Sequence, residues 1–205
     1  MEHLVLHEDV RSGNCYKIRL AAAHAGVAVE RRGYDILLGE TRTPEFLAGV
    51  NPNGRIPVLQ IGDAFLPESN AACFYLGKGT QLVPEDRPAE ADMLRWMFWE
   101  QYSHEPNVAT LRFWRRYVGE DQLTQQQRAL LPVKFADGAA ALALMDAHLA
   151  TRDFFVGRSL TLADLVLYPY THVAAEGGFD LDGSPNLRAW MGRVASHPRH
   201  IGLDD

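Results

Sequence analysis

The 205-residue chain lacks several features that mark common classes of protein. It has two cysteines, Cys15 and Cys73, and neither belongs to a C-x-x-C motif, so a disulfide framework or a zinc site has little support. It contains no G-x-G-x-x-G, P-loop or H-E-x-x-H motif, which removes the usual signs of nucleotide and metalloprotease sites. We therefore expect reduced thiols and no bound metal.

Membrane and nucleic-acid partners also lack support. No apolar run approaches the roughly 18 residues that predict a membrane span, and the N-terminal MEHLVLHEDV is acidic where a secretory signal is positively charged. The 20 basic and 26 acidic residues leave a formal charge of −6, which disfavours attraction to nucleic acid or anionic lipid. These features predict a cytoplasmic protein that binds neither.

The first 80 residues alternate short extended runs with helical ones, in a pattern that predicts a β-α-β-α-β-β-α order. Helical connections between the first three strands favour parallel pairing. Gly62-Asp63 separates the last two strands and predicts a hairpin turn. The runs cover 4–8, 14–26, 27–38, 43–50, 55–67 and 68–77.

The remainder of the chain has no strand signal. Helical periodicities cover 89–102, 125–150, 162–174 and 184–197. The junction QLVPEDRP, at 81–88, has the two prolines and the charged pair typical of an exposed linker. We predict an α/β domain at 1–80 and an all-helical domain at 88–205.

One helix start in the second domain has a sharp signature. In SLTLAD, Thr161 can cap the helix amides, and Asp164, three residues on, can reach back to the amide of Thr161. Asp164 could be mistaken for a catalytic acid, but capping is the simpler explanation.

Two segments of the first domain carry residues suited to ligand binding. In NPNGRIPVL, a cis Ile56-Pro57 bond would turn the Ile56 backbone outward as a partner for an extended peptide-like ligand; a trans bond at a strand start is the alternative. In LPES, Ser69 lies at a helix N-terminus that can hold a carboxylate, and Glu68 beside it could bind an ammonium group. The alternative is that Ser69 caps its own helix and Glu68 is solvated.

The stretch Ser12-Gly13-Asn14-Cys15 begins the first predicted helix. The Ser12 hydroxyl can donate to a thiolate, which the unsatisfied helix amides also favour. Lowering a thiol pKa from about 8.5 by roughly two units requires about 2.7 kcal/mol, within reach of one hydroxyl and a helix terminus. A simple N-cap role for Ser12 or Asn14 is the alternative.

Taken in order, these motifs resemble the cytosolic glutathione S-transferase family over essentially the whole chain. The matching segments are SGNCYKIRL, PEFLAGVNPNGRIPVL, LPESNAACFYL and SLTLADLVLYP. The resemblance implies a thioredoxin-like N-terminal domain that binds glutathione, and an all-helical C-terminal domain that contributes the electrophile pocket, in a homodimer. No tyrosine ends the first strand, so the chain looks like the serine-type, theta- and zeta-like members.

The resemblance also implies roles for individual residues. Ser12 becomes the catalytic donor to the glutathione thiolate, with Asn14 as a candidate helper. Pro57 becomes the cis-proline, and Ile56 becomes the backbone partner of the cysteinyl unit of glutathione.

The charged ends of glutathione are assigned in the same way. Glu68 and Ser69 become the contacts of the γ-glutamyl group. Arg55 becomes a contact of the glycine carboxylate, and Arg42 is a second cationic candidate.

We therefore predict a glutathione transferase whose thiolate attacks an electrophilic or halogenated carbon, or supports isomerisation or reduction. Glutathione is the cosubstrate, and no metal is needed. One rival is a non-catalytic glutathione-transferase-like interaction or regulatory module. Another is a Cys15-dependent thiol-disulfide oxidoreductase, although the spacing of Cys15 from Ile18 and Ala22 favours packing.

Overall fold

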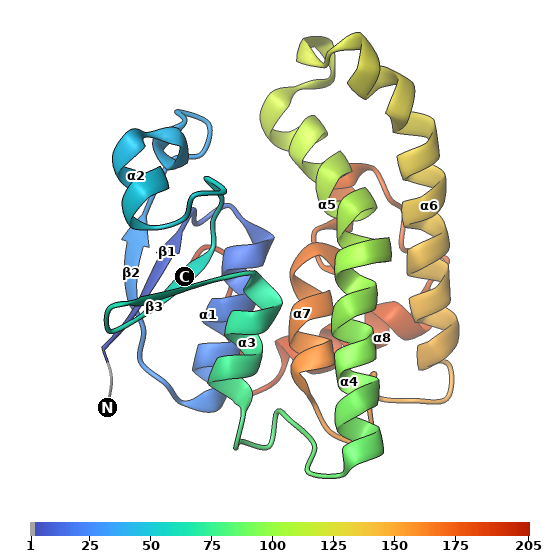
Figure 1. Ribbon diagram of the computed structural model, residues 1–205. Coiled ribbons are helices and arrows are strands. Elements are labelled where there is room, and N and C mark those ends of the chain that lie inside the picture. Colours follow the sequence, from blue (N-terminus) through green and yellow to red (C-terminus); the bar gives the residue numbers. More distant parts are fainter. Residues whose placement is uncertain (1–2) are drawn as a thin grey trace. The chain divides into compact units, whose positions relative to one another are not determined.

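The computed structural model describes residues 3–205, which divide into two compact units (Figure 1). The first unit contains the chain up to Val83 together with Pro198–Asp205, and the second contains Pro84–His197. We expected residues 88–205 to form one helical domain, whereas the final segment groups with the first unit. No helix among residues 3–205 is long and apolar enough to cross a membrane.

The first unit is built on a four-stranded sheet with the order β2-β1-β3-β4. The strands are β1 (Leu4–Glu8), β2 (Glu30–Gly33), β3 (Val58–Ile61) and β4 (Ala64–Pro67). The β3–β4 hairpin turns at Gly62-Asp63, as predicted, with Ile61 paired to Ala64 and a positive φ of 57° at Gly62.

The direction of the third strand differs from the prediction. Strand β2 is parallel to β1, as expected, but β3 is antiparallel to it. The helix between β2 and β3, α2 (Pro44–Gly49), has six residues and spans only about 9 Å. Residues 34–57, which contain this helix, end beside the C-terminal end of β2, so β3 starts at that edge and runs in the opposite direction.

The main helices of the first unit are α1 (Gly13–Ala25) and α3 (Ser69–Gly77), which lie side by side (Figure 1). Helix α1 ends at Gly26, whose φ of 71° is the left-handed conformation that glycine adopts most readily. Cys15, Ile18 and Ala22 are all buried on α1, which confirms the predicted packing face.

Hydrogen bonds to α1 explain why the final segment belongs to the first unit. The Tyr16 hydroxyl donates to the carbonyl of Ile201. The buried Arg19 guanidinium donates to the carbonyl oxygens of Leu203 at 2.7 Å and Asp205 at 2.8 Å. These backbone acceptors fasten residues 201–205 to the helix.

The second unit is helical throughout, as predicted. It contains α4 (Arg87–Trp99), α5 (Glu105–Phe113), α6 (Gln125–Leu149), α7 (Leu162–Thr171) and α8 (Pro185–Ala195). Two π-helical segments, Glu100–His104 and Trp114–Val118, flank α5. Short 3-10 turns lie at Glu120–Gln122 and Ala174–Gly177.

The start of α7 confirms the structural role predicted for Asp164. This carboxylate is fully buried and accepts the backbone N–H of Thr161 at 2.8 Å. It also accepts the N–H of Phe155 at 3.0 Å and the indole N–H of Trp190 at 2.9 Å. Asp164 therefore ties three segments of the helical unit together and is no catalytic acid.

Candidate functional site

The register of the sheet gathers the candidate residues at one edge. His7 of β1 pairs with Val58 of β3, and Val58 pairs with Pro67 of β4. The residues that follow β1, precede β3 and follow β4 therefore leave the sheet at the same edge. They are the loop 9–12, the dipeptide Ile56–Pro57 and the dipeptide Glu68–Ser69.

Ser12 is the N-cap residue of α1 and is half-buried. Its backbone N–H donates to the carbonyl of Asp9 at 2.9 Å. Its side-chain oxygen accepts the N–H of Cys15 at 3.4 Å, which is long for a hydrogen bond. The Ser12 carbonyl also accepts the N–H of Tyr16 at 3.0 Å, so Ser12 has two firm backbone contacts and a weak cap through its hydroxyl.

Asn14 and Ser69 bring the starts of α1 and α3 together. The buried Ser69 hydroxyl donates to the Asn14 side-chain oxygen at 3.3 Å, across 55 positions of sequence. The candidate helper residue and one predicted γ-glutamyl contact are thus neighbours.

Glu68 has an unusual backbone. It is the residue before α3 and adopts φ 74° and ψ 110°, while its side chain is exposed and makes no capping hydrogen bond to the helix. A positive φ outside the αL region costs a residue with a side chain on the order of 1–3 kcal/mol, and such conformations cluster at functional sites. The chain holds Glu68 in this conformation directly beside Ser69.

The segment before β3 is shaped by Asn51, which the sequence did not single out. The Ile56–Pro57 peptide bond is cis. The Asn51 side chain accepts the N–H of Asn53 at 3.0 Å and donates to the carbonyl of Arg55 at 2.9 Å. These two bonds fix the turn that leads into Ile56. The N-P-N-G pattern, typical of an Asx turn, was the available signal.

The two cationic candidates near this turn differ in their contacts. Arg42 donates to the carbonyl of Asn53 at 3.0 Å. A Cβ atom on Gly54 would lie 2.5 Å from the same guanidinium, and Gly54 has a φ of 64°. Arg42 therefore supports the turn. Arg55 is exposed, and its guanidinium makes no ion pair with any residue in the described range 3–205.

Cys15 does not have the surroundings of a reactive thiol. Its side chain is completely buried in α1. Burial raises the pKa of the Cys15 thiol to about 12, although the neighbouring Ser12 hydroxyl acts in the opposite direction. A protonated and inaccessible thiol is a poor nucleophile.

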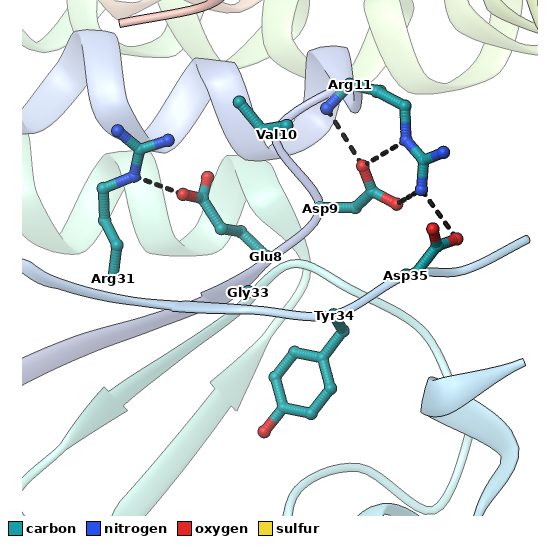
Figure 2. Close-up of a pocket in the computed structure, with 8 residues that line it drawn as sticks. All are labelled: Glu8, Asp9, Val10, Arg11, Arg31, Gly33, Tyr34 and Asp35. Carbon is teal, nitrogen blue, oxygen red and sulfur yellow. Dashed lines mark hydrogen bonds and ion pairs between the residues drawn. The ribbon is translucent and has the colours of Figure 1, made fainter. Parts of the chain in front are cut away.

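The sequence analysis did not identify an ion-pair network that lies beside Ser12. Asp9 and Arg11 face each other in a pocket of about 430 Å³, and Arg11 also reaches Asp35 (Figure 2). Burial alone would raise the pKa of Asp9, but hydrogen bonds from Arg11 and Ile36 outweigh it and hold the pKa below its usual value. Spacing alone gave no sign that the Asp9 carboxylate is buried.

Family comparisons agree with this arrangement. The N-terminal domain model of glutathione S-transferases matches residues 4–78, and the C-terminal domain model matches residues 102–198. The chain is 30% identical to glutathione S-transferase 3 of Zea mays over 207 residues, covering 97% of this chain and 91% of the maize protein. The chain belongs to the glutathione S-transferase family.

Structural comparison gives the same family. A crystal structure of glutathione S-transferase from Pseudomonas fluorescens Pf-5 matches with a TM-score of 0.92 and 43% identity, covering 98% of this chain and 99% of that one. These matches confirm the predicted family, the two-part fold class and the prediction of a glutathione S-transferase. Elongation factor 1-gamma 2 of Oryza sativa subsp. japonica is also 30% identical, over 80% of this chain and 38% of its own length.

Proposed function

We propose that this glutathione S-transferase family member binds glutathione along the sheet edge described above and conjugates its sulfur to an electrophilic small molecule. The observation that carries the proposal is the gathering of the loop 9–12, Ile56–Pro57 and Glu68–Ser69 at one edge, with Ser69 in contact with Asn14. Serine, amide and carboxylate groups of this kind match the thiol and the charged ends of a γ-glutamyl tripeptide.

The γ-glutamyl end is assigned to the start of α3. The Ser69 hydroxyl and the first amides of this nine-residue helix suit a carboxylate, and the exposed Glu68 carboxylate suits the neighbouring ammonium group. The positive φ of Glu68 supports this assignment, because the residue keeps a costly backbone conformation at this position.

The remaining parts of glutathione follow along the same edge. The Ile56 backbone, directly before cis Pro57, pairs with the cysteinyl unit. The exposed Arg55 guanidinium binds the glycine carboxylate.

In this proposal, Ser12 and the first amides of α1 stabilise the glutathione thiolate. The thiol proton leaves to solvent, the Ser12 O–H donates to the sulfur, and the Asn14 amide nitrogen supplies a second donor. The thiolate then forms a carbon–sulfur bond, and the leaving group, such as a halide, departs with its bonding pair. Donors already in place before the reaction lower the barrier without further reorganisation.

The electrophile is proposed to be apolar and to be held by the helical domain, residues 88–205, while residues 1–80 hold glutathione. Isomerisation or reduction of a substrate would use the same thiolate. A homodimer and a cytoplasmic location are typical of the family and belong to the same proposal. The proposed chemistry uses no metal.

A non-catalytic interaction or regulatory module is the second candidate. The match to an elongation factor 1-gamma favours it, whereas the complete set of candidate glutathione contacts favours the enzyme. The oxidoreductase that would use Cys15 is disfavoured, because this thiol is buried and its pKa is raised to about 12.

Calorimetric titration with glutathione, together with a conjugation assay on a halogenated aromatic electrophile, tests the proposal. The wild-type protein should bind glutathione and turn over the electrophile. Ser12→Ala should retain binding within about threefold and lose about 100-fold in turnover, the scale of removing one donor to a developing anion. Undiminished turnover in Ser12→Ala would remove the role of Ser12, and no binding at millimolar glutathione would favour the non-catalytic module.

A further inference from the structure

Hydrogen bonds hold the backbone of the loop that contains Ser12 at several positions. It runs from Asp9 to Ser12, between β1 and α1. The N–H of Ser12 donates to the carbonyl of Asp9 at 2.9 Å, and the Arg19 guanidinium donates to the carbonyl of Val10 at 3.2 Å. The backbone of the loop is therefore fixed by hydrogen bonds that do not depend on the weak Ser12 cap.

The Asp9 carboxylate is the centre of this arrangement. It is 2% exposed and accepts two bonds from the Arg11 guanidinium, from Nε at 2.9 Å and from Nη2 at 2.6 Å. It also accepts the backbone N–H of Arg11 at 3.0 Å and that of Ile36 at 3.2 Å. Four donors in fixed directions leave this carboxylate little freedom.

Arg11 links the loop to the chain that follows β2. Its Nη2 also donates to Asp35 at 2.8 Å (Figure 2). The Asp35 carboxylate in turn accepts the N–H groups of Leu37 at 2.8 Å and Leu38 at 3.2 Å. Because β2 and β3 flank β1 on opposite sides, the loop is held from the β2 side, and the proposed glutathione contacts lie on the β3 and β4 side.

The contribution of this pair to stability is modest. Desolvating the buried Asp9 carboxylate offsets part of the attraction, and the Arg11 side chain is 32% exposed, where solvent screens the charge. A bidentate pair does provide defined geometry. The geometry defined here is that of the loop whose last residue is Ser12.

We propose that Asp9 and Arg11 are positioning residues that act through Ser12 and aim its hydroxyl at the sulfur of bound glutathione. This inference rests on the proposed function. Neither side chain is assigned a contact with glutathione. Their effect is to keep the Ser12 oxygen at a hydrogen-bonding distance from the sulfur, where a small displacement weakens the stabilisation of the thiolate.

Two variants of the full-length protein test this role. Asp9→Asn keeps the shape of the side chain and removes the charge, and Arg11→Lys keeps the charge and removes the bidentate contact. Glu176→Gln is the matched control, because it breaks another arginine pair, with Arg112 at 2.7 Å, in the helical unit. The ultraviolet absorbance of the thiolate against pH gives the pKa of the bound glutathione thiol. Affinity for S-methylglutathione, which has no thiol, reports whether the rest of the site is intact.

The expected result separates positioning from folding. Asp9→Asn should raise the pKa of the bound thiol by about one unit, which lowers the thiolate population below that pKa about tenfold, while affinity for S-methylglutathione stays within about twofold. Arg11→Lys should give a smaller rise in the same direction. Glu176→Gln should leave both quantities at the wild-type values.

Three results would overturn the inference or its foundation, and they are distinguishable. An unchanged thiol pKa in both loop variants would overturn the positioning role alone. Loss of S-methylglutathione affinity in both would show a general structural role instead. A wild-type protein that neither binds glutathione nor lowers its thiol pKa would overturn the proposed function itself. Should Asp9→Asn fail to fold, Arg11→Lys decides the matter.

Discussion

The starts of α1 and α7 are each served by a buried aspartate, but the two carboxylates have different partners. Asp164, at α7, accepts neutral donors from Phe155, Thr161 and Trp190, and burial raises its pKa. Burial would also raise the pKa of Asp9, which lies before α1, but its hydrogen bonds with Arg11 outweigh this effect and lower the pKa. The carboxylate at the start of α7 is therefore bonded to neutral donors, and the carboxylate before α1 is paired with a cation.

The difference separates a helix start that serves stability from one that we propose serves a ligand. At α7 the polar groups around Asp164 all form hydrogen bonds within the helical unit. At α1 the aspartate fixes the approach of the chain, and the cap residue itself has only a 3.4 Å contact through its hydroxyl. A weak cap on a firmly held loop is therefore the feature that distinguishes the candidate site.

Removing the Asp164 carboxylate should have the largest effect on stability. Asp164→Ala leaves the buried donors of Phe155, Thr161 and Trp190 without their acceptor, and we expect a loss of about 3–5 kcal/mol in the free energy of unfolding, measured in urea. Asp146→Ala is the control, because its half-buried carboxylate accepts the N–H of Leu187 at 2.9 Å and should cost only about 1 kcal/mol. Equal losses would contradict the comparison.

The decrease in the free energy of unfolding at acid pH should depend on Asp9. Its pKa in the folded protein lies below the ordinary value of 3.8, so its contribution is fully present above that pH and is lost as the pH falls through the lower folded value. Asp9→Asn should therefore lose less stability than the wild type between about pH 5 and about pH 3. Urea midpoints at both pH values check this, and parallel losses would be evidence against the ion pair.

Relieving the backbone of Glu68 should increase stability and weaken binding. Glycine adopts a φ of 74° without steric cost, so Glu68→Gly should raise the free energy of unfolding by about 1 kcal/mol. Loss of the carboxylate should weaken glutathione binding about tenfold in calorimetry, as expected for one charge-assisted contact. A destabilised variant with full affinity would refute both parts.

Ser12→Ala should change stability by less than about 1 kcal/mol, because the hydroxyl cap is long and weak. Chemical unfolding of this variant beside Asp164→Ala tests the comparison directly. A loss as large as that of Asp164→Ala would mean that Ser12 is chiefly a structural cap.

Cys15→Ala should have the smallest effect on activity. With the thiol buried and its pKa raised to about 12, conjugation and any glutathione-dependent reduction should stay within about twofold of wild type, since the protonated thiol is unreactive. Steady-state assays check this expectation. Abolished reduction with intact glutathione binding would restore the oxidoreductase hypothesis.

The sequence was sufficient where local chemistry decides structure. Gly62-Asp63 specified a hairpin, and the spacing of Thr161 and Asp164 specified a helix start. It was insufficient for the direction of β3, since periodicity reports which faces are buried but not which way a strand runs. That direction depends on where residues 34–57 bring the chain, which only the folded structure shows.

The candidate site shows the same limit. Ser12, Ile56 and Ser69 could be singled out because cap, proline and helix-start patterns are local. In the sequence, Asp9 and Arg11 look like any solvated charge pair, and only the fold buries the Asp9 carboxylate beside the half-buried Arg11. The acceptors of Arg19 at the end of the chain are backbone carbonyls, which no side-chain pattern reveals.

The sequence separation between Arg19 and these acceptors bears on the order in which the two units complete folding during translation. Arg19 and its acceptors at Leu203 and Asp205 are separated by 184 and 186 positions, and the whole helical unit, Pro84–His197, lies between them. During translation, all residues of the helical unit are therefore synthesised before residues 201–205, the last segment of the sheet unit. Domains usually complete their folding from the N-terminus onward, whereas here the unit that is translated first is the last to be finished.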